Sequence, residues 1–92
     1  TPMTIACKEG NKDIIKILVE NGANIYKVDK YGLTLLANVC KEGNINIIKY
    51  LVEKKADVNK KGKNGHTPLR IACEREYFEI IKYLIENGAN VK

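Results

Sequence analysis

Residues 80–90 read IIKYLIENGAN, and residues 14–24 read IIKILVENGAN. Residues 47–57, halfway between them, read IIKYLVEKKAD, so the chain repeats with a period of 33 residues. A repeat of this length predicts a stack of small units, each covering its neighbour. We therefore predict one repeat domain over residues 1–92 and expect it to belong to a longer array. Its copies are residues 1–32, 33–65 and 66–92.

Each copy predicts a short helix, a turn, a second helix and a loop. Thr1-Pro2 and Thr67-Pro68 mark the start of the first helix, because a threonine hydroxyl caps a free N–H and proline is tolerated at the first helical position. Gly10 and Gly43 then supply the left-handed residue that ends this helix. The third copy has Glu76 at the same place, so we expect a strained or differently shaped turn there.

The second helix of each copy is apolar over most of its circumference, as residues 13–20 show. Such a helix must be buried on more than one side, which requires that successive copies stack. Gly22 and Gly88 end this helix, and Lys55 replaces the glycine in the middle copy. The segments 25–32 and 58–65 are rich in Gly, Asn, Asp and Lys, and predict exposed turns or short hairpins.

These segments resemble ankyrin repeats. The resemblance is carried by Asp29–Thr34, Thr67-Pro68-Leu69, Ala72-Cys73 and the endings at residues 18–24 and 84–90, and it covers essentially the whole chain. It implies an all-α solenoid of stacked helix-turn-helix units with projecting β-hairpin loops and a concave recognition surface. The aspartate that opens a hairpin in this family is Asp29 in one loop but Gly62 in the other, so we expect the hairpin at residues 62–65 to be the more mobile one.

The composition and the reactive side chains argue against catalysis. The chain has no serine, which excludes a serine-based triad. Its single histidine, His66, lies in a predicted exposed turn without a partner to orient it, so we expect a surface contact or a solvated ring. No run of apolar residues is long enough to span a membrane. We therefore expect no catalytic residue, metal or cofactor.

The cysteines Cys7, Cys40 and Cys73 lie one per repeat, 33 residues apart. Stacked helices would hold neighbouring cysteines too far apart for a disulfide. No zinc-ligand spacing is present either. We expect all three to be small buried residues, and unpaired thiols of this kind favour an intracellular location, the cytoplasm or the nucleus.

By the resemblance, a partner contacts the hairpin tips and the inward face of the first helices. Tyr31 and Leu33 stand out, because they are apolar or aromatic where a solvated hairpin would be polar; alternatively, Tyr31 packs on the neighbouring hairpin. The matching hairpin positions are Val28, Lys30, Tyr31, Leu33, Lys61, Lys63, Asn64 and His66. The matching helix positions are Lys8, Glu9, Lys41, Glu42, Glu74 and Arg75.

Three functions compete. The first is a protein-interaction module that binds another protein on its concave face. The second is electrostatic binding of nucleic acid or an anionic surface through the basic cluster Lys54–Lys63, although nucleic acid is disfavoured because no aromatic side chain is interleaved among these lysines. The third is a purely structural segment of a longer array, or self-association through exposed repeat ends, because Ile80, Ile81, Leu84 and Ile85 are apolar where a capping repeat would be polar.

Overall fold

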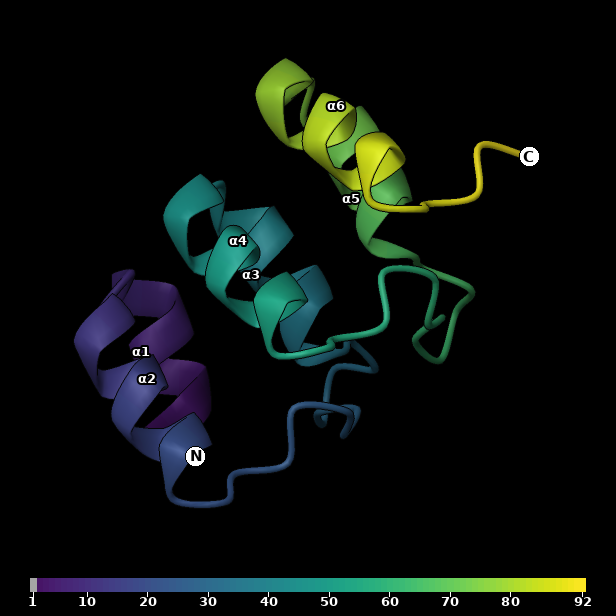
Figure 1. Ribbon diagram of the computed structural model, residues 1–92. Coiled ribbons are helices and arrows are strands. Elements are labelled where there is room, and N and C mark those ends of the chain that lie inside the picture. The colour runs from purple at the N-terminus through teal and green to yellow at the C-terminus, as the bar shows by residue number, and fades with distance from the viewer. Residues whose placement is uncertain (1) are drawn as a thin grey trace.

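The computed structural model describes residues 2–92. These residues form six helices in three consecutive pairs, and the pairs stack along one direction (Figure 1). The helices are α1 (Pro2–Glu9), α2 (Lys12–Glu20), α3 (Leu35–Glu42), α4 (Ile45–Glu53), α5 (Pro68–Glu74) and α6 (Phe78–Glu86). The expected all-α solenoid of helix-turn-helix units is confirmed.

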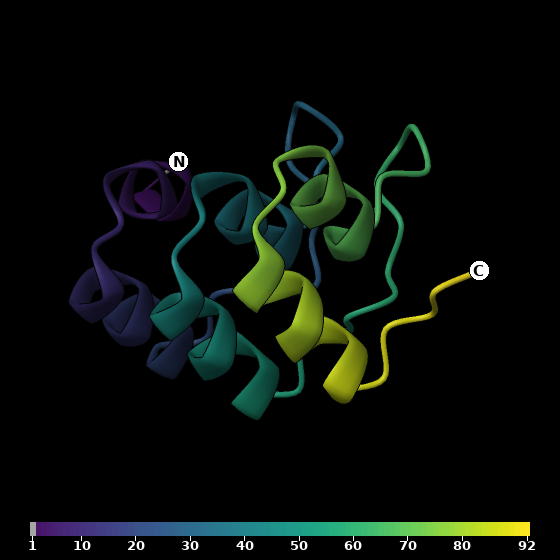
Figure 2. The same ribbon diagram turned by 90° about the horizontal axis from the view of Figure 1, so that it is seen from above.

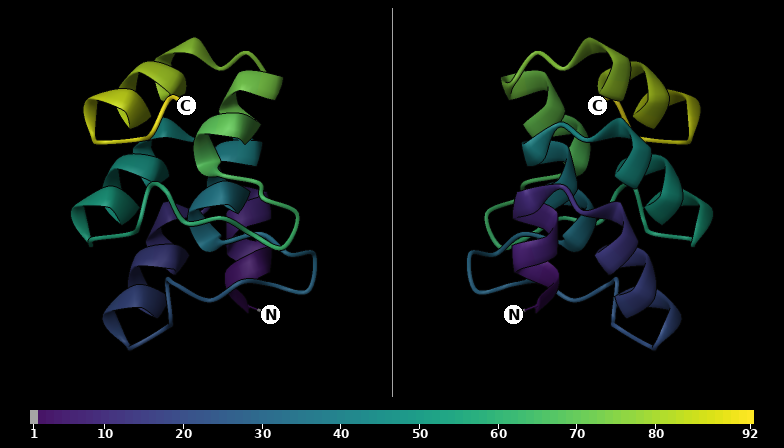
Figure 3. Two further views of the ribbon diagram at one scale, coloured as in Figure 1. Left: turned by 90° about the vertical axis from the view of Figure 1, so that its right-hand side faces the viewer. Right: turned by 90° about the vertical axis from the view of Figure 1, so that its left-hand side faces the viewer.

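The helices form two layers (Figure 2). The inner layer contains α1, α3 and α5, with α3 packed between the other two, and the outer layer contains α2, α4 and α6. The first loop, residues 21–34, and the second loop, residues 54–67, cross from the outer to the inner layer and then project beyond it. Figure 3 shows their tips one above the other on the inner-helix side.

Side chains cap four of the helices where the backbone N–H groups have no helical partner. The hydroxyl of Thr34 accepts a hydrogen bond from the Ala37 N–H at 3.1 Å, and the hydroxyl of Thr67 accepts one from the Arg70 N–H at the same distance. Asn11 and Asn44 cap α2 and α4 in the same way, which the sequence analysis did not identify. The predicted cap at Thr1 lies outside the described residues.

The turns adopt the predicted left-handed backbone. Gly10 and Gly43 have φ angles of 68° and 77°, and the non-glycine residues Glu76 and Lys55 have 57° and 73°. A side chain at positive φ crowds its own backbone, which costs about 1–2 kcal/mol per residue. The expected strain at Glu76 is therefore confirmed.

Replacing Glu76 with glycine is expected to raise the free energy of unfolding by about 0.5–1 kcal/mol, because the relief of strain exceeds the added flexibility of the unfolded chain. Urea unfolding measures this. Glu76→Ala is the matched control, since it removes the same carboxylate but keeps the Cβ atom. If the glycine and alanine variants are equally stable, the strain is not the cause.

The two end repeats bury less of their outer helices than the middle one. Helix α4 buries Ile47, Ile48, Tyr50 and Leu51, as predicted for a helix covered on more than one side. The same prediction is wrong for α2, whose Ile14 and Ile17 are 41% and 59% exposed. The reason is that the middle repeat has a neighbour on each side, whereas α2 has one on one side only.

The cysteines follow the same rule, so the expectation that all three are buried is wrong for one of them. Cys7 and Cys40 are 3% and 0% exposed, because α3 covers α1 and α5 covers α3. Cys73 occupies the equivalent position in α5 and is exposed, since no further helix lies over it. All three thiols are free.

A thiol reagent is expected to modify Cys73 in the folded protein at least about a hundredfold faster than Cys7 or Cys40, because reaction needs an accessible thiolate. Mass spectrometry of peptides from timed alkylation measures the three rates separately. If all three cysteines react at the same rate in native buffer, the packing described for α1 and α3 is contradicted.

Backbone hydrogen bonds close each projecting loop and join the two loops. An isolated antiparallel bridge pairs Val28 with Thr34 in the first loop. In the second loop the Gly62 N–H donates to the His66 carbonyl at 3.0 Å. The Lys63 N–H donates to the Gly32 carbonyl at 2.8 Å, which holds one loop on the other. The loops are thus hairpin-shaped turns, without longer strands among residues 2–92.

Candidate functional site

A concave depression of about 270 Å³ lies where the two loops meet the inner helices α3 and α5. We call it the groove. Eight residues line it: Tyr31, Leu33, Lys41, Asn64, His66, Ile71, Glu74 and Arg75. Seven of them are among the predicted contact residues, although they come from four separate segments of the chain. Ile71 was missed, because an apolar residue inside a first helix is indistinguishable from core in the sequence.

The other predicted contact residues lie outside the groove. Val28 is half-buried and forms the bridge to Thr34. Glu42 is exposed at the end of α3 and does not line the groove. Lys61 lines a different depression. The remaining ones are exposed residues of α1 or of the loop tips: Lys8, Glu9, Lys30 and Lys63.

The apolar part of the groove is formed by Tyr31, Leu33 and Ile71. Tyr31 is 67% exposed, whereas Ile71 is 7% exposed and Leu33 is half-buried. The Lys30 ammonium stands 5.2 Å from the centre of the Tyr31 ring, a cation–π distance. The ring is therefore displayed at the loop tip rather than packed away, and exposed aromatic side chains in concave sites are common anchors for partners.

Asp29 fixes the loop that carries this aromatic ring. Its carboxylate accepts hydrogen bonds from the Tyr31 N–H at 2.8 Å, from the Leu33 N–H at 3.0 Å and from the Asn38 side chain at 2.7 Å. Partial burial raises the pKa of Asp29, but these hydrogen bonds and the charge of Lys41 outweigh it, so the pKa lies below its usual value of 3.8. The contacts hold the first loop against α3.

Replacing Asp29 with alanine is expected to lower the free energy of unfolding by about 2 kcal/mol, because three hydrogen bonds are lost. Asp29→Asn should lose about half as much, since its oxygen still accepts from both N–H groups while its amide faces that of Asn38. The folded pKa is depressed, so the contribution of Asp29 is complete above pH 4 and is lost as the pH falls through the folded pKa. Urea unfolding of both variants at neutral and acidic pH tests this, and an alanine variant as stable as the parent would contradict it.

His66 differs from the solvated ring that the sequence predicted. The residue is half-buried, and its Nδ1 atom is shielded from solvent without a hydrogen-bond partner among residues 2–92. Its backbone carbonyl closes the second loop by accepting from Gly62. The ring thus forms part of the wall of the groove.

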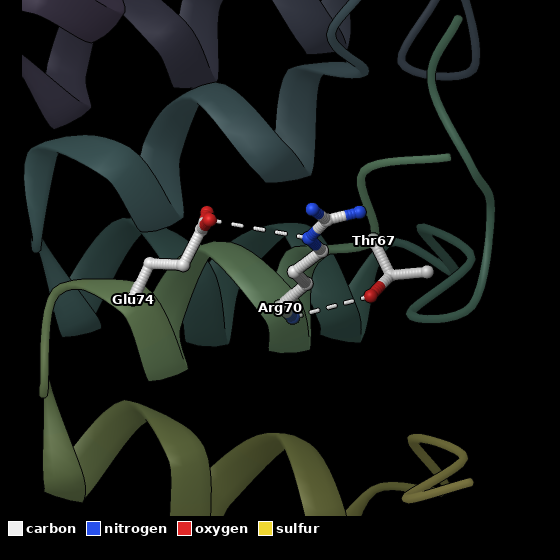
Figure 4. Close-up of polar contacts among 3 residues, drawn as sticks. All are labelled: Thr67, Arg70 and Glu74. Carbon is white, nitrogen blue, oxygen red and sulfur yellow. Dashed lines mark hydrogen bonds and ion pairs between the residues drawn. The ribbon is translucent and has the colours of Figure 1, made fainter. Parts of the chain in front are cut away.

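The charged residues of the groove are Lys41 on α3 and Glu74 with Arg75 at the end of α5. Glu74 faces Arg70 one turn earlier on α5, with the Arg70 Nε and a Glu74 carboxylate oxygen 3.9 Å apart (Figure 4). Both side chains are more than half exposed, so the pair contributes little to stability. It does provide the Glu74 carboxylate with a nearby positive charge.

Metal ligands and buried thiols within residues 2–92 can be placed individually. No cluster of three or more His, Cys, Asp or Glu side chains within residues 2–92 is suited to a metal ion. Burial raises the pKa of Cys40 to about 12, and burial together with the charges of Glu42 and Asp29 raises that of Cys7 to about 12. Such thiols are poor nucleophiles. Within the same residues no helix has the length and apolar character needed to cross a bilayer.

A second depression of about 580 Å³ lies on the open side of the last repeat. It contains Leu69, Cys73 and Val91, and both Cys73 and Val91 are exposed where their equivalents in the earlier repeats are buried. Val91 is 67% exposed, whereas Val58 and Ile25 are 8% and 9% exposed. This surface corresponds to the side that a following repeat covers elsewhere in the stack.

Comparison with known proteins agrees with this architecture. A sequence model of the family described as ankyrin repeats matches residues 3–92 in three copies. The chain is 53% identical over 34 residues to a Caenorhabditis elegans protein named "Ankyrin repeat and KH domain-containing protein mask-1". That match covers 37% of this chain and 1% of the relative, so the matched region is about as long as one repeat.

Proposed function

The chain belongs to the ankyrin-repeat family, and from that premise we propose that it is a binding module that holds a partner protein on its concave face without catalysis. Ankyrin repeats are generally protein-interaction modules. The observation that carries the concave-face assignment is the groove, in which both loops and two inner helices contribute to one depression beside an exposed aromatic ring. Rigid helices position such a site more firmly than loops alone.

The first test is affinity capture of a partner, followed by binding measurements with the purified pair. Replacing Tyr31, Leu33 and Arg75 with alanine is expected to weaken binding at least tenfold, about 1.4 kcal/mol or more, because aromatic and arginine side chains dominate interfaces. Circular dichroism should show unchanged helix content. Unchanged affinity would refute the concave-face assignment.

Phe78→Ala is the matched control for this test. Phe78 is an aromatic residue on α6 with 72% exposure, similar to Tyr31, but it belongs to the outer layer. If the groove binds the partner, Phe78→Ala leaves the affinity unchanged. If it weakens binding as much as the groove variant, the partner lies on the outer helices.

A second candidate function is that of a structural segment within a longer array, and burial at equivalent repeat positions favours it. Ile14 is 41% exposed, while Ile47 and Ile80 are 1% and 3% exposed because the preceding repeat covers them. At the other end Ile85 is 44% exposed. Both ends therefore present the apolar surface that repeats bury against each other.

Sedimentation tests this second candidate. Uncovered repeat ends predict that the 92 residues self-associate as concentration rises, and that replacing Ile14 and Ile17 with lysine abolishes association. A strictly monomeric protein with cooperative unfolding at all concentrations would count against it.

The electrostatic alternative has less support. The stretch after α4 lies on the outer-layer side, while the tip of the second loop projects on the inner side, so the basic cluster Lys54–Lys63 is divided between two places (Figure 2). The Lys54 ammonium stands 5.7 Å from the Tyr50 ring, and the Lys60 ammonium donates to the Tyr26 carbonyl at 2.7 Å. Two of the lysines thus have partners within the fold. For location, the free thiols lead us to propose a reducing compartment, the cytoplasm or the nucleus.

A further inference from the structure

Positively charged side chains outnumber negatively charged ones around the groove. Lys41 and Arg75 lie in its wall, and Lys61 and Lys63 are exposed on the loop beside it. No acidic residue occurs between Val58 and His66, so no carboxylate lies at the tip of the second loop beside these lysines. A concave surface with such an excess attracts negatively charged groups.

The acidic residues near the groove are already engaged. Asp29 directs its carboxylate to two backbone N–H groups and to Asn38, and its charge lies close to Lys41. Glu74 lies beside Arg70. Arg75, in contrast, forms no ion pair within residues 2–92. An incoming carboxylate therefore finds an unpaired guanidinium, which binds carboxylates in two-point geometry.

Three of the eight residues that line the groove are apolar, which distinguishes it from a purely electrostatic surface. Tyr31, Leu33 and Ile71 contribute hydrocarbon, and the volume of about 270 Å³ is enough for one large side chain but not for a folded element. Binding here would remove apolar surface from water in addition to pairing charges. The occupant should therefore carry both kinds of group.

We propose that the groove recognises an acidic peptide segment, in which one aromatic or large aliphatic side chain enters the groove and flanking Asp or Glu side chains pair with Arg75, Lys41 and the second loop. This inference rests on the proposed function and names the chemistry of the partner. Acidic peptide is favoured over nucleic acid because apolar side chains line the groove beside its positive charges, and because its volume of about 270 Å³ suits a single side chain.

The experiment is selection of a random peptide-display library on the intact 92-residue protein at low salt. The selected peptides should be enriched in Asp and Glu and should contain one aromatic or large aliphatic residue. A synthetic peptide of the selected sequence should then bind at least about tenfold more weakly to the variant Lys41→Glu, Arg75→Glu, and more weakly at high salt, because charge pairs are screened and reversed.

A second charge reversal provides the control. The variant Lys54→Glu, Lys55→Glu changes the net charge by the same amount, but these residues follow α4 on the outer-layer side. Its affinity for the peptide should stay within about twofold of the parent. Equal weakening by both variants would show attraction to net charge alone and would overturn the inference.

The single histidine reports where the peptide binds. Because the chain contains one histidine, the carbon-bound ring protons of His66 give isolated NMR signals that are expected to shift on titration with the peptide. Signals that stay in place while the peptide binds would overturn the inference. Selection of neutral or basic peptides, or failure to select any peptide, would also overturn it. The same holds if a homopolymeric oligonucleotide displaces the peptide at a lower concentration than unlabelled peptide does. Neutral binders that shift His66 would leave the proposed function standing, whereas binders of any charge that leave His66 unchanged would argue against both.

Discussion

Replacing Gly62 with alanine is expected to lower the free energy of unfolding by about 2 kcal/mol and to weaken partner binding at the same time. A Cβ atom built on Gly62 would overlap the carbonyl oxygen of Gly32. That oxygen accepts the hydrogen bond from the Lys63 N–H by which the second loop lies on the first. Backbone cannot yield as a flexible side chain can, so the loops must separate and the hydrogen bond is lost.

The effect on binding follows from the construction of the groove. Tyr31 and Leu33 come from the first loop and Asn64 and His66 from the second, so separation of the loops moves the two walls apart. Displacements of this kind are costly where side chains must meet a partner together. We expect at least a tenfold weaker affinity, about 1.4 kcal/mol, in addition to the loss of stability.

Asn64→Ala is the control that tests whether the loss of stability in Gly62→Ala comes from the contact between the loops or from any substitution in the second loop. Asn64 is exposed in the same loop and, among residues 2–92, forms no backbone hydrogen bond that joins the two loops, so its replacement should change stability by less than about 0.5 kcal/mol. Urea unfolding gives both stabilities. A Gly62→Ala protein as stable as Asn64→Ala would show that the loops do not stack as described.

The second large effect is a loss of stability at alkaline pH. Burial raises the pKa values of Cys7 and Cys40 from 9.0 to about 12, with a further contribution to Cys7 from Glu42 and Asp29. Because the folded pKa lies above the unfolded one, the stabilisation is complete below pH 9 and is lost as the pH rises from 9 toward 12. Midway through this range, ionisation of each thiol is expected to lower the free energy of unfolding by about 2 kcal/mol.

Unfolding by urea at a series of pH values, under reducing conditions, measures this loss. The variant Cys7→Ala, Cys40→Ala should be less stable at neutral pH because of the cavities, but its stability should fall less steeply above pH 9. Cys73→Ala should keep the slope of the parent, since that thiol is exposed. A double variant with an unchanged slope would mean that lysines and tyrosines, rather than the buried thiols, cause the loss.

The features predicted best from the sequence were those fixed within one repeat. Helix starts at threonine, helix ends at glycine and the strained turn at Glu76 depend on neighbouring residues, and the structure has them where the pattern placed them. Whether an equivalent residue is buried depends instead on the next repeat. Cys73 and Cys40 occupy equivalent positions in their repeats, and the packing of α5 over α3 accounts for the difference in their exposures.

The loops show a second limit of prediction from the sequence. Gly62 was interpreted as the loss of a hairpin aspartate, because one loop has Asp29 at that place. The structure gives a different reason, since Gly62 lies directly against the Gly32 carbonyl and no side chain fits. A contact between two loops 30 residues apart leaves no local pattern. Ile71 was missed for a related reason, because its position at the groove depends on how both loops fold over α5.

The central claim is that a partner occupies the concave face. Amide hydrogen exchange of the protein, free and bound to a purified partner, tests it most directly because it reports on both faces in one measurement. Binding at the groove predicts slower exchange at residues 30–33 and 63–66 and along α5, with α2 and α6 unchanged. Slower exchange confined to the outer helices α2, α4 and α6 would contradict the claim.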